Sequence, residues 1–317
     1  MSSRTLIIGA CGQIGSEIVR ALRARDGENS VIATDIYDNN AEVVNSGPFE
    51  ILDAKDYVAV KDCVIRNEID TVYLMAAILS AKGEQYPEKA WDLNMTTLFN
   101  VLNLAKEGYI KKLFWPSSIA VFGPSTPKDN TPQRTIMEPT TVYGITKQVG
   151  ERWCDYYHSH FKVDVRSLRY PGIISWRTKP GGGTTDYAVE IYHKALDDGF
   201  YECFLSADTE LPMMYMEDAI KATLNIMDAP SEAIKIRSSY NLAAISFSPK
   251  EIAASIQRHI ENFTIEYSPD FRQNIADSWP NSIDDAKARD HWNWKHEFNL
   301  DDITEEMLKK LTKTQLT

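Results

Sequence analysis

The chain has 317 residues, of which 43% are hydrophobic, and its formal net charge at pH 7 is −11. This acidic balance, without any Lys- or Arg-rich block, argues against nonspecific binding to nucleic acid or to an anionic membrane. No apolar run approaches the ~18–20 residues that a bilayer-spanning helix needs, and the first expected strand leaves no room for a signal peptide. We therefore expect a globular cytoplasmic protein, or a mitochondrial matrix protein if a transit peptide is missing from this sequence.

A β-rich run at residues 5–8 predicts the first strand, and a glycine-rich turn with Gly9, Gly12 and Gly15 follows it directly. A helical pattern begins after the turn. This order of strand, turn and helix binds a pyrophosphate on backbone N–H groups at the helix N-terminus. The Gly-x-x-Gly-x-x-Gly spacing departs from the Gly-x-Gly-x-x-Gly dinucleotide fingerprint by one residue, in the first gap.

A second expected strand, residues 30–35, ends in Asp35, about 20 residues after the glycines. Its carboxylate can accept hydrogen bonds from both ribose hydroxyls of NAD, whereas it would repel the 2′-phosphate of NADP. Residues 36–38 supply no Arg to offset that repulsion. The sequence therefore favours NAD over NADP. The alternative for Asp35 is a helix cap or a solvated strand end.

Further strands are expected near residues 48–52, 70–75, 112–117 and 163–168, with helical stretches between them. This alternation predicts an α/β fold, a Rossmann-type doubly wound parallel sheet. After about residue 170 the periodicity weakens and Gly and Pro become frequent. We expect residues 1–170 to form the dinucleotide-binding domain and residues 171–317 mainly a smaller, irregular substrate-binding lobe, with some segments returning to the sheet.

Tyr143 and Lys147 are four residues apart and lie on one face of an expected helix. A nearby ammonium stabilises a phenolate and lowers the pKa of the phenol, so this pair can provide a base. Ser118, which follows the fifth expected strand, completes a Ser/Tyr/Lys trio. A Tyr-x-x-x-Lys pair by itself is common on exposed helices, and the glycine turn and Asp35 give it weight here.

Together these features resemble the extended branch of the short-chain dehydrogenase/reductase superfamily, which includes the nucleotide-sugar epimerases. The resemblance implies that Ser118, Tyr143 and Lys147 are catalytic and that Met75 is a tolerated departure from a His-Ala-Ala pattern. It also implies an NAD site formed by Gly9, Gly12, Gln13, Ile14, Gly15, Asp35, Ile36, Asp53, Ala54, Leu74, Ala76, Ala77, Asn94, Tyr143, Lys147 and Ile173.

Four blocks, at residues 115–123, 143–147, 180–188 and 211–219, resemble motifs of the short-chain type of L-threonine 3-dehydrogenase. This resemblance implies NAD-dependent oxidation of the 3-hydroxyl of L-threonine to 2-amino-3-ketobutyrate. It also implies a set of substrate-binding residues. Two alternatives stay open within this set: Trp279 is either a lid or an ordinary packed aromatic residue, and Thr185 and Asp186 either bind substrate or only cap a helix. The set is Ser80, Ser117, Ser118, Tyr143, Thr185, Asp186 and Trp279.

Two other functions stay open: an NAD-retaining nucleotide-sugar epimerase or dehydratase, and a noncatalytic dinucleotide-binding regulator. Epimerases of this branch usually carry Asn where this chain has Gly172, and the C-terminal part lacks an Arg cluster for a second pyrophosphate. A buried diphosphate without its donors would be poorly bound. The complete trio argues against the regulator.

The remaining motifs concern metals and partners. His158 and His160 lie two apart on an expected helix and point in different directions, so we predict no metal site. The cysteines are scattered, as is usual in a reducing compartment. Apolar residues recur along 85–107 and 147–160, which core packing explains, although relatives pair such helices across a two-fold axis as a four-helix bundle. We expect a homodimer with a small-molecule substrate.

Overall fold

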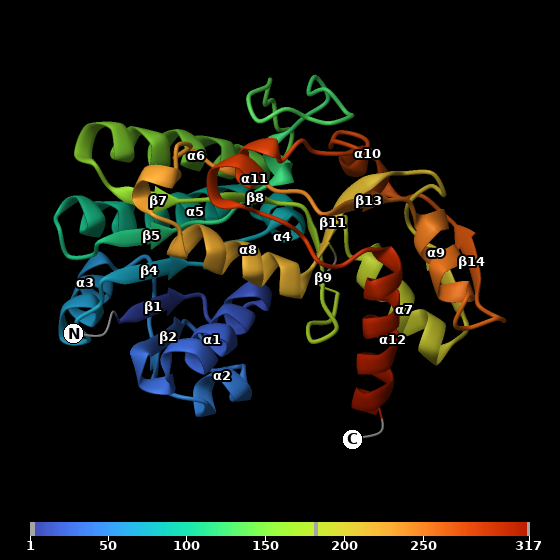
Figure 1. The fold of residues 1–317 in the computed structure, drawn as a ribbon, viewed down its shortest axis with the longest axis horizontal. Helices are drawn as coiled ribbons and strands as arrows, with labels where there is room; N and C mark the ends of the chain where they lie inside the picture. Colours follow the sequence, from blue (N-terminus) through green and yellow to red (C-terminus); the bar gives the residue numbers. More distant parts are fainter. Residues whose placement is uncertain (1–3, 181–182, 316–317) are drawn as a thin grey trace. The chain divides into compact units, whose positions relative to one another are not determined.

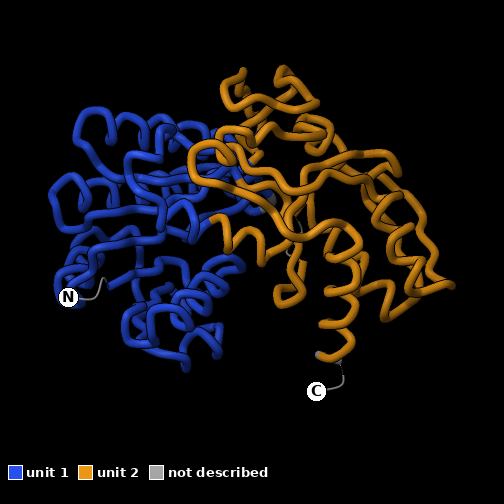
Figure 2. Tube along the Cα trace, viewed as in Figure 1, with its two compact units in different colours: residues 1–118, 141–169, 223–240 blue, residues 119–140, 170–222, 241–317 orange. Residues whose placement is uncertain are grey.

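The computed structural model describes residues 4–180 and 183–315. The chain forms two compact units with interleaved segments (Figure 2). Unit 1 comprises Met1–Ser118, Thr141–Arg169 and Thr223–Tyr240, and unit 2 comprises Ile119–Thr140, Tyr170–Ala222 and Asn241–Thr317. One limit between the units therefore falls at residue 170, but residues 119–140 belong to unit 2 and residues 223–240 to unit 1.

Unit 1 contains a six-stranded parallel sheet with the strand order β3-β2-β1-β4-β5-β7 (Figure 1). This order is that of a Rossmann fold and confirms the predicted doubly wound sheet. The central strand β1 is buried along its whole length and β2 over its first four residues, and both consist mostly of apolar residues, as expected of parallel strands that are buried on both faces. The strands are β1 (Thr5–Ile8), β2 (Val31–Asp35), β3 (Phe49–Ile51), β4 (Thr71–Leu74), β5 (Lys112–Phe114) and β7 (Asp164–Arg166).

The helices of unit 1 connect these strands and pack on the sheet. The apolar faces of α3, α5 and α6 share a core with the strands, which includes Leu6, Val72, Leu98, Leu113 and Cys154. The helical elements are α1 (Gln13–Asp26), η1 (Glu28–Ser30), α2 (Ala41–Asn45), α3 (Tyr57–Arg66), α4 (Ser80–Gln85), α5 (Pro87–Lys106), α6 (Val142–Phe161) and η3 (Ser231–Ala233).

Helix α6 carries the predicted Tyr143 and Lys147, and its sequence fixes both its start and its packing. Thr141 is the N-cap, and its Oγ1 accepts a hydrogen bond from the Gly144 N–H at 3.1 Å. Gly150 weakens a helix interior by ~0.5–1 kcal/mol relative to Ala, but a Cβ there would lie 2.4 Å from Cη2 of Trp115. The glycine therefore lets the segment after β5 pack closely on α6.

Residues 223–240 join unit 1 through the C-terminal end of helix α8 (Met216–Asp228), not through a strand of the six-stranded sheet. Arg166 Nη1 donates hydrogen bonds to the carbonyls of Ile226 at 2.6 Å, Met227 at 3.0 Å and Ala229 at 2.6 Å. Carbonyls at a helix C-terminus lack intrahelical partners and attract cations. Among the described residues, all strands of the six-stranded sheet come from residues 5–166. Residues 223–240 therefore belong to unit 1 without adding a strand to this sheet.

Unit 2 contains a mixed sheet of order β13-β11-β9 and a parallel pair, β10-β14. A further sheet, β12-β8-β6, uses short strands near the limits of the units: β6 (Ser117–Ser118), β8 (Leu168–Tyr170) and β12 (Tyr240–Asn241). The other elements are η2 (Ile119–Val121), β9 (Gly172–Ile174), α7 (Tyr187–Asp197), β10 (Phe200–Cys203), β11 (Leu211–Tyr215), β13 (Ile245–Phe247), α9 (Pro249–Gln257), β14 (Thr264–Tyr267), α10 (Phe271–Ala276), α11 (Ala286–Trp292) and α12 (Leu300–Gln315). Among the described helices of both units, none combines the length and apolar character needed to cross a membrane.

Candidate active site

The turn after β1 needs glycine at its first and third positions. Gly9 has φ +84°, and a Cβ there would lie 2.5 Å from the backbone N of Ala76. A Cβ on Gly15 would lie 2.2 Å from the Gly9 carbonyl oxygen. At Gly12, by contrast, the nearest atom to an added Cβ is the Gly9 oxygen at 3.4 Å. An added Cβ at Gly12 would therefore make only ordinary van der Waals contact, so this position is uncrowded and a ligand can approach the backbone there.

Helix α1 begins directly after this turn, at Gln13. Its N-cap, Gly12, supplies no side-chain acceptor, and the first turn holds no acidic residue. The N–H groups of Gln13, Ile14 and Gly15 have no acceptor within the helix. These donors and the positive end of the helix dipole suit a phosphate group. The predicted pyrophosphate site is therefore compatible with the observed backbone.

Asp35 lies at the end of β2, beside the glycine turn. One carboxylate oxygen accepts the Cys11 N–H at 2.9 Å, and the other accepts the Ile36 N–H at 2.8 Å. The two bonds hold the carboxylate at the carboxyl end of the sheet, where ligands of such folds bind. Asp35 thus caps no helix in this structure. Its contact with a ribose stays a prediction.

Several other residues predicted to bind NAD in unit 1 lie at or just after the carboxyl ends of strands. Asp53 comes after β3, and its side chain accepts the Lys55 N–H at 2.9 Å. Ala54 is buried, and its carbonyl accepts a hydrogen bond from Asn100 at 2.9 Å. Leu74 ends β4 and is buried, and Ala76 and Ala77 come after it and are half-buried. Ile173 lies in unit 2, on β9.

Asn94, another predicted NAD-binding residue, ties together three segments of unit 1. From α5, its Oδ1 accepts the Ile78 N–H at 2.8 Å, and its Nδ2 donates to the Ile78 carbonyl at 3.1 Å. Nδ2 also lies 3.2 Å from Oγ1 of Thr146 on α6. The amide therefore ties the loop after β4 to α5 and to α6, the helix that carries Tyr143 and Lys147.

The structure brings Ser118, Tyr143 and Lys147 together within unit 1. Ser118 shares a hydrogen bond with the Tyr143 hydroxyl. Lys147 Nζ lies 5.4 Å from the centroid of the Tyr143 ring and 4.6 Å from that of Trp115. Nζ also donates a hydrogen bond of 2.6 Å to the carbonyl of Pro116. Strand β6 and helix α6 thus present a hydroxyl, a phenol and an amine at one place.

Burial governs the titration of this trio. It raises the pKa of Tyr143 to about 12, although the hydrogen bond with Ser118 acts in the opposite direction. Burial also lowers the pKa of Lys147 to about 7, against the opposing effect of the Glu151 carboxylate. The sequence-based expectation that Lys147 lowers the pKa of Tyr143 is therefore wrong for the protein alone, because desolvation is the larger influence.

Ser117, predicted to bind substrate, makes its hydrogen bond inside unit 1. Its Oγ donates to Oε1 of Glu151 at 2.7 Å. Arg169 binds both carboxylate oxygens of Glu151, at 2.8 Å and 2.7 Å, and both of these side chains are buried. Sequence reasoning missed Glu151 and Arg169. The spacing of four residues that singled out Tyr143 and Lys147 would have reached Glu151 at the next step.

The other predicted substrate-binding residues lie in both units. Ser80 begins α4 in unit 1 and is half-buried. In unit 2, Asp186 is the N-cap of α7, as the sequence predicts, but its carboxylate accepts the Gly183 N–H at 2.8 Å and not a bond from the helix. Trp279 is only 7% exposed, so it is a packed aromatic residue in this structure. Its role as a lid stays a prediction.

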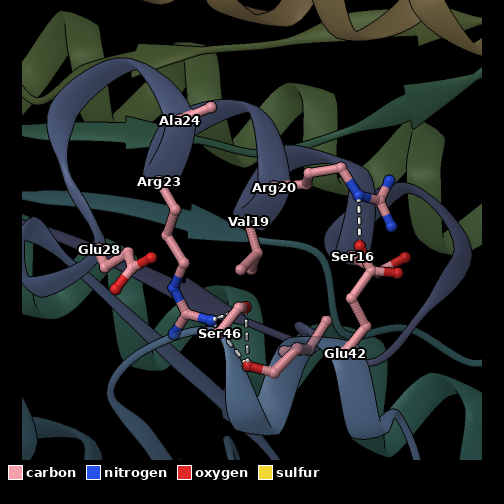
Figure 3. A pocket seen from close by; sticks show the side chains of 9 residues that line it. Ser16, Val19, Arg20, Arg23, Ala24, Glu28, Glu42 and Ser46 are labelled. Atoms are coloured by element: carbon pink, nitrogen blue, oxygen red, sulfur yellow. Dashed lines mark hydrogen bonds and ion pairs between the residues drawn. The ribbon is translucent and has the colours of Figure 1, made fainter.

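One pocket in unit 1 contains none of the predicted site residues (Figure 3). Arg23 lies in it and donates hydrogen bonds to the Val43 carbonyl and to Ser46 Oγ, both at 2.7 Å. These bonds tie α1 to α2, so we assign the pocket a structural role. It is lined by Ser16, Val19, Arg20, Arg23, Ala24, Glu28, Glu42, Val43 and Ser46. Among the residues that the structure describes, no three His, Cys, Asp or Glu side chains gather in a way that could hold a metal ion.

The chain is similar to known proteins over nearly its whole length. The chain is 48% identical over 310 residues to an uncharacterized epimerase/dehydratase of Staphylococcus haemolyticus, covering 97% of both chains. It is 52% identical to the GalE-like L-threonine dehydrogenase from Cupriavidus necator in its holo form, with a TM-score of 0.95 over 97% of this chain and 99% of that one. It is also 48% identical to a monomeric L-threonine 3-dehydrogenase from a metagenome, with a TM-score of 0.93 over 98% and 99% of the two chains. Residues 5–243 match the NAD dependent epimerase/dehydratase family, and the chain therefore belongs to that family.

Proposed function

We propose that the protein is an NAD-dependent L-threonine 3-dehydrogenase. In this reaction the C3–H bond of L-threonine breaks as a hydride passes to NAD, the 3-hydroxyl loses its proton, and 2-amino-3-ketobutyrate, NADH and a proton are formed. The observation that carries the proposal is the hydrogen bond between Ser118 and Tyr143 beside Lys147, in the same unit as the open glycine turn. Two solved structures that this chain resembles over nearly its whole length bear the name of this enzyme.

NAD, when bound, supplies the hydride acceptor. The backbone N–H groups at the start of α1 would hold its pyrophosphate, because they point beyond the helix and lack intrahelical acceptors. Gly12 would let the diphosphate approach the backbone closely. Asp35, fixed by two backbone N–H groups, would accept hydrogen bonds from the adenosine ribose.

Tyr143 would take the proton of the 3-hydroxyl, and Ser118 would hydrogen-bond the same substrate oxygen as negative charge develops on it. Loss of a proton from the half-buried Tyr143 phenol, whose pKa is raised by desolvation, requires a compensating positive charge. Lys147 in its protonated form and Arg169 together exceed the single negative charge of Glu151, so a Tyr143 phenolate would bring this buried group to neutrality. The trio would then act as one charge-balanced unit.

Packing around Gly172 favours a small substrate over a nucleotide sugar. A Cβ at this position would lie 2.4 Å from Sδ of Met213 and 2.8 Å from Cγ2 of Thr185. The Asn that epimerases of this branch use toward a diphosphate therefore has no room here. Thr185 and Asp186 are the residues that we propose to hold the amino-acid groups, with the Asp186 carboxylate facing the ammonium.

We also propose a homodimer formed through α5 and α6. Large aromatic side chains are exposed on both helices, among them Trp91 (45%), Tyr156 (43%) and Phe161 (44%). Such exposure is typical of interaction surfaces. Since one similar enzyme is named as monomeric, the oligomeric state must be measured. Sedimentation velocity of the wild-type protein and of Tyr156→Asp would show a dimer that the charge dissociates, and a wild-type monomer would contradict the proposal.

The decisive experiment is an assay of NADH formation, followed by its absorbance, with purified protein, NAD and L-threonine. L-serine, UDP-glucose and NADP serve as control exchanges. Threonine-dependent NADH supports the dehydrogenase. An epimerase that retains NAD would instead be indicated by three results together. The protein would form no NADH with threonine, it would convert the nucleotide sugar without net NADH, and its cofactor would stay bound through purification.

A further inference from the structure

Each of the three residues of the segment Pro116–Ser118 contacts a different side chain of helix α6. The contacting helix residues, Tyr143, Lys147 and Glu151, follow one another at intervals of four residues. Lys147 Nζ donates to the Pro116 carbonyl at 2.6 Å. The next residue along the segment, Ser117, donates to Glu151 at 2.7 Å, and Ser118 pairs with Tyr143. Side chains four residues apart share one helix face, so a single face of α6 is matched to a single short segment.

The Glu151 contact differs from the other two because it lies outside the trio and is anchored from another strand. Glu151 is 0% exposed, and Arg169 on β8 binds both of its carboxylate oxygens. A bidentate Arg–carboxylate pair has a defined geometry. The carboxylate is therefore fixed in place, and Ser117 is fixed by it.

We propose that Glu151 is a positioning residue: it holds Ser117, and thereby sets the Pro116 carbonyl and the Ser118 hydroxyl at Lys147 and Tyr143. This inference rests on the proposed dehydrogenase reaction for its kinetic consequence. It assigns Ser117 to the support of the trio and not to direct contact with substrate.

Glu151 also contributes its negative charge to the surroundings of Lys147. The groups around the lysine are Tyr143, Cys154 and Glu151 on α6 itself, the Trp115 ring and the Pro116 carbonyl on the facing segment, and Arg169 behind the carboxylate. The Glu151 carboxylate favours the protonated amine, whereas burial raises the pKa of the Cys154 thiol and keeps it uncharged at neutral pH. Loss of the Glu151 charge would therefore leave Lys147 less protonated at neutral pH.

The kinetic test compares Ser117→Ala with Ser167→Ala. Ser167 is a matched control because it is buried and hydrogen-bonded to Ser239 at 2.9 Å, away from the contacts of the trio. With L-threonine, Ser117→Ala should lower kcat roughly 2–10-fold, as expected for one lost hydrogen bond, with KM nearly unchanged. Ser167→Ala should behave like the wild type. A raised KM with normal kcat in Ser117→Ala, or equal kcat in both variants, overturns the proposal.

A second measurement does not depend on turnover. Lys147 is titrated by NMR in protein with carbon-13 at lysine Cε, without NAD or substrate, and its signal is assigned from Lys147→Met. In Glu151→Gln the titration midpoint should fall by about one pH unit, and an unchanged midpoint in a folded variant overturns the proposal. If Glu151→Gln does not fold, the Ser117→Ala kinetics decide. If the wild type makes no NADH from L-threonine, the proposed function has failed, and the titration still tests the positioning role.

Discussion

Replacing Lys147 with Met tests the buried amine without reference to catalysis. Lys147 is 3% exposed, and burial lowers its pKa from 10.5 to about 7. Between those two values the unfolded chain binds a proton that the folded protein does not. The free energy of unfolding must therefore increase with pH over this window. Met is similar in length and has no proton to bind, so Lys147→Met lacks this contribution.

The expected size follows from the two pKa values. Where the unfolded chain binds one proton more than the folded protein, the free energy of unfolding increases by about 1.4 kcal/mol for each pH unit. At pH 7 the folded-state lysine is still about half protonated, so the change between pH 7 and pH 9 is roughly 2 kcal/mol. Tyr143 does not obscure this trend, because its pKa is raised to about 12 and an unfolded tyrosine titrates near pH 10. The measurement therefore stays at or below pH 9.

The assay is urea unfolding followed by circular dichroism, in the absence of NAD so that binding does not contribute. The stability difference between wild type and Lys147→Met is plotted against pH. Val149→Ala, on the same helix, removes packing but no titratable group, and its difference from wild type should not vary with pH. A Lys147→Met difference that is equally flat would refute the lowered pKa and the charge argument built on it.

Three further predictions concern the proposed site. Tyr143→Phe should lower turnover roughly 10²–10⁴-fold with nearly intact NAD affinity, and near-normal turnover would reject Tyr143 as the base. Asp35→Ala should weaken NAD binding and relax the discrimination against NADP, measured by titrating each cofactor; an unchanged preference would show that Asp35 does not contact the ribose. Gly9→Ala should lower the melting temperature and abolish NAD binding, because the added Cβ would lie 2.5 Å from the Ala76 nitrogen at a positive φ; a normal melting temperature would contradict this packing.

The sequence predicted the sheet because its strands are short runs rich in apolar residues and separated by helical stretches, a pattern typical of parallel strands that are buried on both faces. It predicted less about the division into units. Residues 223–240 belong to unit 1 through Arg166 and the end of α8, which is a set of side-chain hydrogen bonds to carbonyls. Such hydrogen bonds leave no periodic pattern of apolar residues in the sequence, so they could not be predicted from it.

The candidate site was predictable where spacing reflects geometry. Tyr143 and Lys147 lie on one face of α6, and Ser118 meets them. The direction in which the pKa of Tyr143 shifts was not predictable, because it depends on how deeply the phenol is buried. Glu151 was missed for a related reason, since an acidic residue within a helix usually lies on a solvated face, and only the fold brings Arg169 to it.

The buried pair of Glu151 and Arg169 is better explained by the site than by stability. Removing two charges from water costs several kcal/mol per ion, and apolar residues of similar volume often stabilise a protein as well or better. This pair, however, contacts Ser117 and contributes to the charge around Lys147. Burial shifts both Tyr143 and Lys147 toward their neutral forms, which disfavours a Tyr143 phenolate paired with a Lys147 ammonium. The fixed negative charge of Glu151 favours the ammonium and so opposes this effect of burial. On the proposed mechanism, the half-buried Tyr143 would therefore depend, as a base, on the acidic residue Glu151, to which we assign no contact with the substrate.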